Sequence, residues 1–321
     1  MDTTPTHAGA RAGDTTWHPG EQALQARLGM RERMAEIGPQ VIRDHMPDQH
    51  RELFEKLPTM LLGALDASGQ PWATMLAGRP GFVATPDART MAITSTLDAQ
   101  DPALAALRAS GPGAQVGLLG LEPHTRRRNR MNGRLEAMSD GALRVGVVQS
   151  FGNCPKYIQA RDPLRWDDAP PALAQPLDAA LDEAALARIA AADTVFIASA
   201  SAPVPGDGRA EGVDVSHRGG PPGFVAAHRR LDGGIELLIP DFPGNRFFMT
   251  LGNLLRHPRA GLLVPDYDTG ELLHLTAEAS VLWSDEARGL RLRVTAGLRR
   301  PGALAWRWSP ALLAPQFDPF A

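Results

Sequence analysis

The sequence predicts a mainly β protein with short helices, in which two similar halves each form a small antiparallel barrel. The main observation is a repeat: Pro-Gly-Phe-Val occurs at residues 80–83 and again at 222–225, with similar elements around both copies in the same order. The apolar runs are also short and separated by turn residues, as in strands. The repeat guides the rest of the interpretation, because each copy is one structural unit.

The repeat extends beyond this motif. Residues 114–119 (AQVGLL) hold the place in the first half that residues 258–263 (PRAGLL) hold in the second, and a long predicted strand follows each. The second half carries polar residues that suit a phosphate group, and the first half has lost most of them. A duplication in which only one copy keeps these phosphate-binding residues indicates a ligand at the joint between the halves.

Helices are predicted from capping residues and apolar spacing. Residues 20–37 have a helical composition, and Pro39 ends this helix. Asp101 is expected to cap a helix that extends to residue 109, with Pro102 at its first position. The other predicted helices cover residues 48–57 (with Asp48 as N-cap), 179–192 and 246–256.

Strands are predicted where short apolar runs end in turn residues. In the first half they cover residues 59–65, 72–76, 90–94 and 116–121, and a hairpin over 131–148 turns at Asp140-Gly141. In the second half they cover residues 194–200, 213–217, 223–226, 235–239, 261–264 and 273–281.

Composition bounds the class of protein. A chain of 321 residues predicts two domains, and a net charge of -3 gives no overall attraction to nucleic acid or membrane. The single cysteine, Cys154, fits a reducing compartment. Residues 1–13 lack the apolar core of a signal peptide, and no apolar stretch approaches the roughly 18 residues of a membrane span. We therefore expect a soluble, cytoplasmic protein.

Domain boundaries follow from the same composition. The first residues are small and polar, and residues 161–178 contain four prolines and little periodicity. The predicted organisation is a disordered tail (1–16), a first domain (17–160), a linker (161–178) and a second domain (179–321).

The strongest group of candidate site residues lies in the second half, between residues 214 and 224. Arg218 offers a planar fork for a phosphate, Ser216 offers a hydroxyl, and Gly219-Gly220 leaves room for backbone N–H groups. A solvated glycine-rich bend that exposes His217 and Arg218 is an equal alternative on residue types alone.

A second candidate is Asn245-Arg246, at the start of a predicted helix. Helix N-termini hold anions, and a cation in the first turn opposes the helix dipole. A bound phosphate would remove that conflict, which favours a functional role. The alternative is an ordinary Asn245 cap beside an exposed Arg246.

The basic run from Arg126 to Arg130 lies at the entry to the long strand of the first half. Such a run is usually a solvated strand face or a loose contact for a polyanion. Because of this position, a ligand at the joint could be bound by both halves. One half could bind its phosphate, and the other half could contact its ring. Cys154 precedes a proline and has no base placed nearby in the sequence, so buried packing is favoured over a role as nucleophile. Lys156 and Gln159 are either ligands or surface residues.

Several chemistries have no signature here. The sequence contains no Walker loop, no CxxC, no dinucleotide fingerprint, no zinc spacing and no GxSxG elbow. No metal site and no catalytic residue are therefore predicted.

Together the motifs resemble those of the pyridoxamine 5'-phosphate oxidase-like superfamily of FMN-binding split barrels. The resemblance is greatest to its bacterial branch of predicted flavin-nucleotide-binding proteins. The motifs span residues from about 17 to 283, and the main ones are VDVSHRGGPPGFV (213–225), GNR (244–246) with TLGN (250–253) and HP (257–258), RRR (126–128) with NG (132–133), and FGNCPKYIQ (151–159).

The resemblance implies two tandem split β-barrels that form a pseudo-dimer within one chain, with FMN at their joint. It implies an FMN-dependent oxidoreductase that acts on a small molecule, served by an electron donor or a separate reductase, without vitamin B6 specificity. The implied FMN-binding residues are Ser216, His217, Arg218, Gly219, Asn245, Arg246 and Asn253 of the second half, and Arg128, Asn129 and Arg130 of the first. The first half departs from the pattern at residues 72–76 and lacks Gly-Asn-Arg, so no second equivalent site is expected.

Two other functions stay open. One is a heme-binding or heme-degrading split barrel, with His217, His257 or His274 as axial ligand. The other is a non-enzymatic flavin carrier or electron-transfer protein. Nucleic acid and membrane are not expected partners, and a homodimer is compatible with the sequence.

Overall fold

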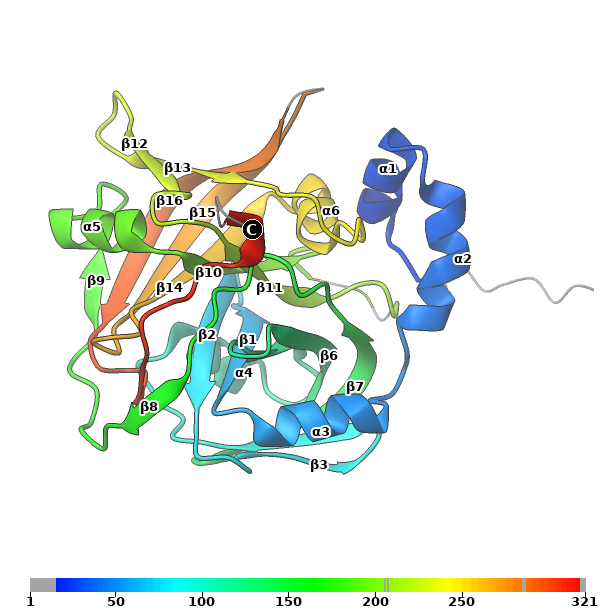
Figure 1. The fold of residues 1–321 in the computed structure, drawn as a ribbon, viewed down its shortest axis with the longest axis horizontal. Helices are drawn as coiled ribbons and strands as arrows, with labels where there is room; N and C mark the ends of the chain where they lie inside the picture. The colour runs from blue at the N-terminus through cyan, green and yellow to red at the C-terminus, as the bar shows by residue number, and fades with distance from the viewer. Residues whose placement is uncertain (1–15, 205, 207, 285–286, 318–321) are drawn as a thin grey trace, which may run out of the picture.

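A computed structural model describes residues 16–204, 206, 208–284 and 287–317, so most of the predicted disordered tail lies outside the described residues. The described chain is mainly β, with six short α-helices, as the sequence predicted (Figure 1). Its strands form two large antiparallel sheets and one small two-stranded sheet. None of the described helices is long and apolar enough to cross a membrane.

The two large sheets share one strand order. The first runs β2-β1-β5-β6-β7-β4-β3, and the second runs β11-β10-β14-β15-β16-β13-β12, so that each strand has a counterpart. Neither described sheet closes on itself, which is consistent with a split barrel. The first sheet contains β1 (Thr59–Leu65), β2 (Pro71–Ala77), β3 (Val83–Asp87), β4 (Thr90–Thr94), β5 (Gln115–Glu122), β6 (Arg127–Met138) and β7 (Ala142–Gly152). The second contains β10 (Thr194–Ala200), β11 (Val213–Gly219), β12 (Ala226–Arg229), β13 (Ile235–Pro240), β14 (Arg259–Pro265), β15 (Leu272–Trp283) and β16 (Arg288–Arg300).

The proline-rich segment between the sheets contains two short strands that the sequence did not predict. Strand β8 (Pro163–Trp166) pairs with β17 (Trp306–Trp308), and β9 (Gln175–Leu177) pairs with β16. This segment is therefore attached to the second half of the chain along part of its length.

The helices follow the prediction with two larger corrections. The helices α3 (Asp48–Lys56), α4 (Pro102–Ser110) and α5 (Glu183–Ala191) overlap the predicted ranges, and Asp101 caps α4 through its side chain. The N-cap of α3 is Pro47 rather than Asp48, and α5 begins at Glu183 rather than at residue 179. The predicted helix over residues 20–37 is wrong as a single element. It is divided into α1 (Pro19–Arg27) and α2 (Arg31–Val41) at Gly29, whose positive φ of 65° interrupts the helix. Pro39 lies inside α2 and does not end it.

The second correction concerns α6 (Met249–Arg256), which was expected to begin at residue 246. Phe248 is the N-cap and adopts a left-handed backbone conformation. Packing explains the later start. Phe247 packs against Trp17 and Phe151 in tilted and edge-to-face contacts, and Phe248 packs against Trp283 in a tilted one, so both rings are directed into apolar clusters.

The two sheets meet along β1, β2 and β5 of the first and β10, β11 and β14 of the second. An apolar cluster joins them: Leu61, Ala73, Met75, Leu119, Leu121, Ile158, Phe196, Ala198, Val215, Leu263, Leu272, Leu304 and Trp308. Gly117 and Gly261, which hold equivalent positions in the two halves, allow the sheets to approach each other closely. A Cβ on Gly117 would collide with Val213 O, and a Cβ on Gly261 would collide with Pro71 O. The joint between the halves is thus a packed interface.

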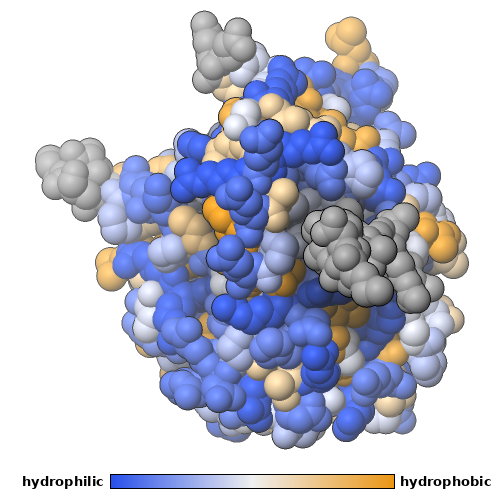
Figure 2. Space-filling model, turned by 90° about the vertical axis from the view of Figure 1, so that its right-hand side faces the viewer, coloured by the Kyte–Doolittle hydropathy of each residue, from blue (hydrophilic) through white to orange (hydrophobic). Residues whose placement is uncertain are grey.

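Helices α1 and α2 lie at one end of the molecule, where α1 packs against α6 (Figure 1). Hydrophilic residues cover most of the face seen from that end, and the hydrophobic residues visible there are scattered (Figure 2). Strand β11 and the segment before α6 lie near this junction and form the floor and one wall of the cavity described next.

Candidate functional site

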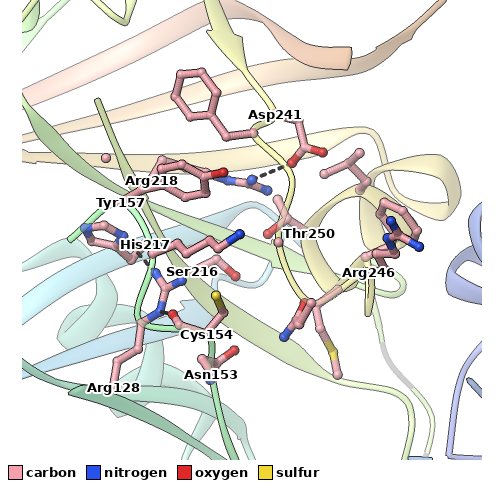
Figure 3. A pocket seen from close by; sticks show the side chains of 18 of the residues that line it. Arg128, Asn153, Cys154, Tyr157, Ser216, His217, Arg218, Asp241, Arg246 and Thr250 are labelled. Carbon is pink, nitrogen blue, oxygen red and sulfur yellow. Dashed lines mark hydrogen bonds and ion pairs between the residues drawn. The ribbon is translucent and has the colours of Figure 1, made fainter. Parts of the chain in front are cut away.

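A cavity of about 120 Å³ lies between β11, the segment that precedes α6, and residues 153–157 of the first half (Figure 3). Most of the predicted cofactor-binding residues line it: Arg128, Arg130, Ser216, His217, Arg218, Gly219, Asn245 and Arg246. The structure thereby brings together residues that are far apart in the sequence. Their role in cofactor binding stays a prediction.

The cavity lining is strongly cationic. Six of the lining residues are basic: Arg128, Arg130, Lys156, Arg218, Arg246 and Arg288. Asp241 is the one carboxylate among the described lining residues. A concave site lined by charges of one sign concentrates ligands of the opposite sign, so this cavity favours an anion.

Three of these cations have carboxylate partners. Arg130 Nη1 donates to Asp214 Oδ1 at 2.9 Å, and both side chains are buried. Arg218 Nη1 lies 2.6 Å from Asp241 Oδ1 (Figure 3), and Arg288 Nε lies 3.4 Å from the other oxygen of the same carboxylate. The negative charge of Asp241 is thus shared between two guanidinium groups, which limits its repulsion of an anion.

Arg128 has no carboxylate partner among the residues that the structure describes. Its Nε donates to Cys154 O at 2.9 Å, and its Nη1 donates to His217 Nδ1 at 2.8 Å. Burial, together with the neighbouring Arg130 and Arg218, lowers the pKa of Arg128 to about 10. Arg128 is half-buried, and a partly desolvated cation without a counter-ion is costly, so an anion in the cavity would relieve that cost.

His217 is buried and neutral. Burial, with Arg128 and Arg218 close by, holds the pKa of His217 well below its usual range. Since Arg128 can only donate, His217 Nδ1 is the acceptor and Nε2 carries the proton. This Nε2–H has no hydrogen-bond partner in the described part of the protein.

The unpartnered buried polar atoms around the cavity share one property. Within the described residues they are His217 Nε2, Arg218 Nε, Arg130 Nε and Asn153 Nδ2. All four are N–H donors. Because buried donors in native proteins are nearly always bonded, this set indicates a ligand that offers only acceptors, such as a phosphate.

Asn245 and Arg246, in the segment before α6, do not have the helix-start positions that were predicted for them. Asn245 does not cap the helix: its Oδ1 accepts from Phe247 N at 3.2 Å, within the preceding turn. Arg246 is exposed, has a positive φ of 62°, and lies outside the first helical turn. The dipole argument for Arg246 is therefore wrong, and its place in the site rests on its position at the cavity wall.

Two predicted residues, Asn129 and Asn253, do not line the cavity. Asn253 lies behind it on α6, where Nδ2 donates to Asp214 Oδ2 at 2.9 Å and Oδ1 accepts from His18 Nε2 at 2.9 Å. Asp214 in turn holds Arg130. Asn253 therefore connects helix α1 to the cavity floor through buried hydrogen bonds.

Other residues of this region were not predicted as site residues. Arg288 belongs to β16, a strand that was not predicted, and His18 and Glu21 were not considered. Burial raises the pKa of Glu21 well above its usual range, and nearby Asp214 adds to this. Gln159 is structural, since it bonds Gly220 O and Ala314 N, whereas Cys154 and Lys156 line the cavity.

Of the three histidines considered as heme ligands, only His217 lines the cavity. His257 Nε2 bonds Gly69 O at 2.8 Å, and His274 Nδ1 bonds Ala73 O at 2.9 Å, both buried between the sheets. The described residues contain no group of three or more His, Cys, Asp or Glu side chains that could hold a metal ion.

Part of this chain matches a known protein family. Residues 46–166 match the family model described as pyridoxamine 5'-phosphate oxidase. This match supports the resemblance to the pyridoxamine 5'-phosphate oxidase-like superfamily that the motifs indicated. The match includes Arg128 and Arg130 and ends before the second sheet begins.

Solved structures are similar to parts of this chain. The heme storage protein HutZ of Vibrio cholerae is 16% identical, with 38% of this chain and 95% of that one covered and a TM-score of 0.25. HupZ of Group A Streptococcus is 13% identical, with 33% and 93% covered and a TM-score of 0.26. A FAD-binding protein of Mesorhizobium loti is 12% identical, with 40% and 99% covered and a TM-score of 0.25. Comparison with curated proteins gave no match.

Proposed function

We propose that the protein is an FMN-binding oxidoreductase that acts on a small molecule and holds the flavin phosphate in the cationic cavity. The observation that carries the proposal is the set of unpartnered buried N–H donors around the cavity. The superfamily resemblance supports FMN as the phosphate-bearing group. When bound, the flavin would supply the redox chemistry, and the protein would supply phosphate contacts, ring orientation and exclusion of water.

The cavity residues fit a phosphate in number and kind. Arg128, His217 and Arg218 offer charged or neutral N–H donors, Ser216 offers a hydroxyl, and Arg246 adds a cation at the wall. The enclosed volume of about 120 Å³ is smaller than the roughly 300 Å³ or more of cavities that enclose a whole ligand. A flavin nucleotide would therefore place its phosphate inside and extend into the open mouth.

We also propose that the two sheets are tandem split barrels that form a pseudo-dimer within the chain. Their shared strand order supports this. So does a mirrored contact: Arg130 Nη2 donates to Val215 O at 3.0 Å, and His274 Nδ1 bonds Ala73 O at 2.9 Å. Arg130 and His274 lie opposite Leu119 and Leu263, which the sequence repeat aligns.

The first half has a region equivalent to the cavity, around Thr74, and side chains of the protein itself fill it. Arg300 bonds Asp101 Oδ2 and Asp98 Oδ2 at 2.5 Å each, and Asp101 also accepts from Thr74, the counterpart of Ser216. The guanidinium of Arg300 thus lies where the counterpart site would be. This arrangement supports one FMN site per chain.

Arg246→Ala is expected to weaken FMN binding about tenfold, because the variant loses a charge-assisted contact to the phosphate. The affinity for riboflavin, which lacks the phosphate, should stay unchanged. Titration followed by flavin fluorescence measures both, and the exposure of Arg246 predicts an unchanged fold by circular dichroism. Normal FMN affinity in this variant would contradict the phosphate assignment.

The alternatives have distinct outcomes. A heme role is opposed by the tautomer of His217, because Nε2 carries the proton and cannot bind iron while Arg128 donates to Nδ1. A hemin titration with a shifted absorbance band that His217→Gln abolishes would support the heme role. A flavin carrier would bind FMN and show no turnover unless a separate reductase is added. Turnover of the FMN-loaded protein without a partner supports the enzyme.

A further inference from the structure

Three aromatic rings are grouped at the edge of the cavity, and we call them the aromatic wall: Tyr157, Phe242 and Phe317. Their ring centroids lie 5.1 Å (Tyr157–Phe242), 5.5 Å (Tyr157–Phe317) and 5.2 Å (Phe242–Phe317) apart. Tyr157 and Phe242 line the cavity, whereas Phe317 packs behind both. All three rings are half-buried, so apolar ring surface remains accessible at this edge.

Tyr157 is held in an unfavourable backbone conformation. Its φ is 68°, which is uncommon for a residue with a side chain. Its Oη donates to Pro243 O at 2.9 Å, and its N donates to Gln316 Oε1 at 3.2 Å. Its carbonyl oxygen packs so closely on Gly219 that a Cβ there would collide with it. Strain that several contacts maintain is typical of ligand-binding positions.

The end of the described chain is fixed against the same segment. Leu312 pairs with Ala160 as an isolated β-bridge, and Ala314 N donates to Gln159 Oε1 at 2.6 Å. These bonds place Phe317, in the short 3-10 turn Pro315–Phe317, behind the two lining rings. The C-terminal segment is thereby a structural part of the cavity edge.

We propose that Tyr157 and Phe242 bind the planar heteroaromatic ring of the phosphorylated ligand, with Phe317 as their support. The cavity then has two parts, a cationic floor for the phosphate and an aromatic edge for the ring. Aromatic side chains bind flat rings through stacking, and they do so without reading the pattern of polar groups on the ring. This inference rests on the proposed function, because the cationic floor supplies the phosphate half of the ligand.

The test compares ring binding with phosphate binding. Tyr157→Leu and Phe242→Leu should each lower the affinity for FMN and for riboflavin roughly tenfold. The affinity for inorganic phosphate, measured by calorimetry, should not change. The fluorescence of FMN, which stacking quenches in the wild-type complex, should recover in the bound state of both variants. Tyr157→Phe keeps the ring and should preserve both the affinity and the quenching.

The outcomes separate this inference from the proposed function. If wild-type protein binds FMN but both leucine variants keep its affinity and its quenching, the aromatic wall is only packing and the inference is wrong. Wild-type protein that binds neither FMN nor inorganic phosphate overturns the proposed function as well. Loss of phosphate binding in the leucine variants would show general damage to the cavity, and would also count against a separate ring subsite.

Discussion

Replacing Arg128 by leucine is expected to weaken FMN binding at least about 30-fold, since loss of a buried charged contact costs roughly 2 kcal/mol or more. Arg128 is half-buried in the cavity and has no carboxylate partner among the described residues, so a phosphate would be its first counter-ion. Riboflavin should bind the variant and the wild type with similar affinity. Flavin fluorescence titrations of both ligands measure the difference.

The same substitution should leave the ligand-free protein nearly as stable, within about 1 kcal/mol. Cys154 O and His217 Nδ1 would lose a donor, but the cost of burying an unpaired guanidinium would disappear. Such a residue lowers the stability of the ligand-free protein and is retained because it binds the ligand, which is a trade-off between stability and function. Urea unfolding of the apo protein measures it.

Arg127→Leu is the matched control, because Arg127 is the exposed neighbour of Arg128 and does not line the cavity. This control should bind FMN as the wild type does. Equal FMN affinity in Arg128→Leu and Arg127→Leu would refute the assignment of Arg128 to the phosphate.

Asp214→Leu is expected to lower the free energy of unfolding by about 3–5 kcal/mol. The Asp214 carboxylate accepts from three donors: the buried Arg130 Nη1 at 2.9 Å, the buried Asn253 Nδ2 at 2.9 Å and the half-buried Asn132 Nδ2 at 2.8 Å. Removing it leaves the buried Arg130 charge uncompensated and separates α6 from the cavity floor. Denaturant unfolding monitored by tryptophan fluorescence measures the loss.

Adding Arg130→Met to this variant should recover a large part of the loss, because the unpaired charge is then removed too. Glu136→Leu serves as the control. Its exposed pair with Arg144 should contribute less than about 1 kcal/mol. An Asp214→Leu protein as stable as the Glu136 variant would mean that the buried network does not support the site.

Local sequence signals predicted much of the fold. Strand β1 and strand β4 follow from short apolar runs, and the β6–β7 hairpin from Asp140-Gly141. The capped start of α4 at Asp101 is equally local. The start of α6 is not determined by local sequence, because it depends on the packing of Phe247 and Phe248 against distant rings.

Strand β16 shows a signal that was present and overlooked. Leu290, Leu292 and Val294 are buried at alternate positions, with arginines between them. That alternation is typical of a half-buried strand, but the arginines concealed it. Arg288 of the cavity was missed for the same reason.

The site was predictable where motifs are continuous, as at Ser216-His217-Arg218. It was not predictable where residues meet only in three dimensions. His18 and Asn253 are 235 residues apart and hydrogen-bond behind the cavity, and no local pattern indicates such a pair. The same limit applies to the aromatic wall, whose rings come from three separate segments.

The central claim is that the cavity holds FMN, and the most direct measurement is to denature the purified protein and identify any small molecule released. Absorbance and mass spectrometry of the supernatant distinguish the candidates. We expect release of FMN, at no more than one molecule per chain, because Arg300 fills the counterpart site. Release of heme without flavin would contradict it, and so would a ligand-free protein that does not bind added FMN.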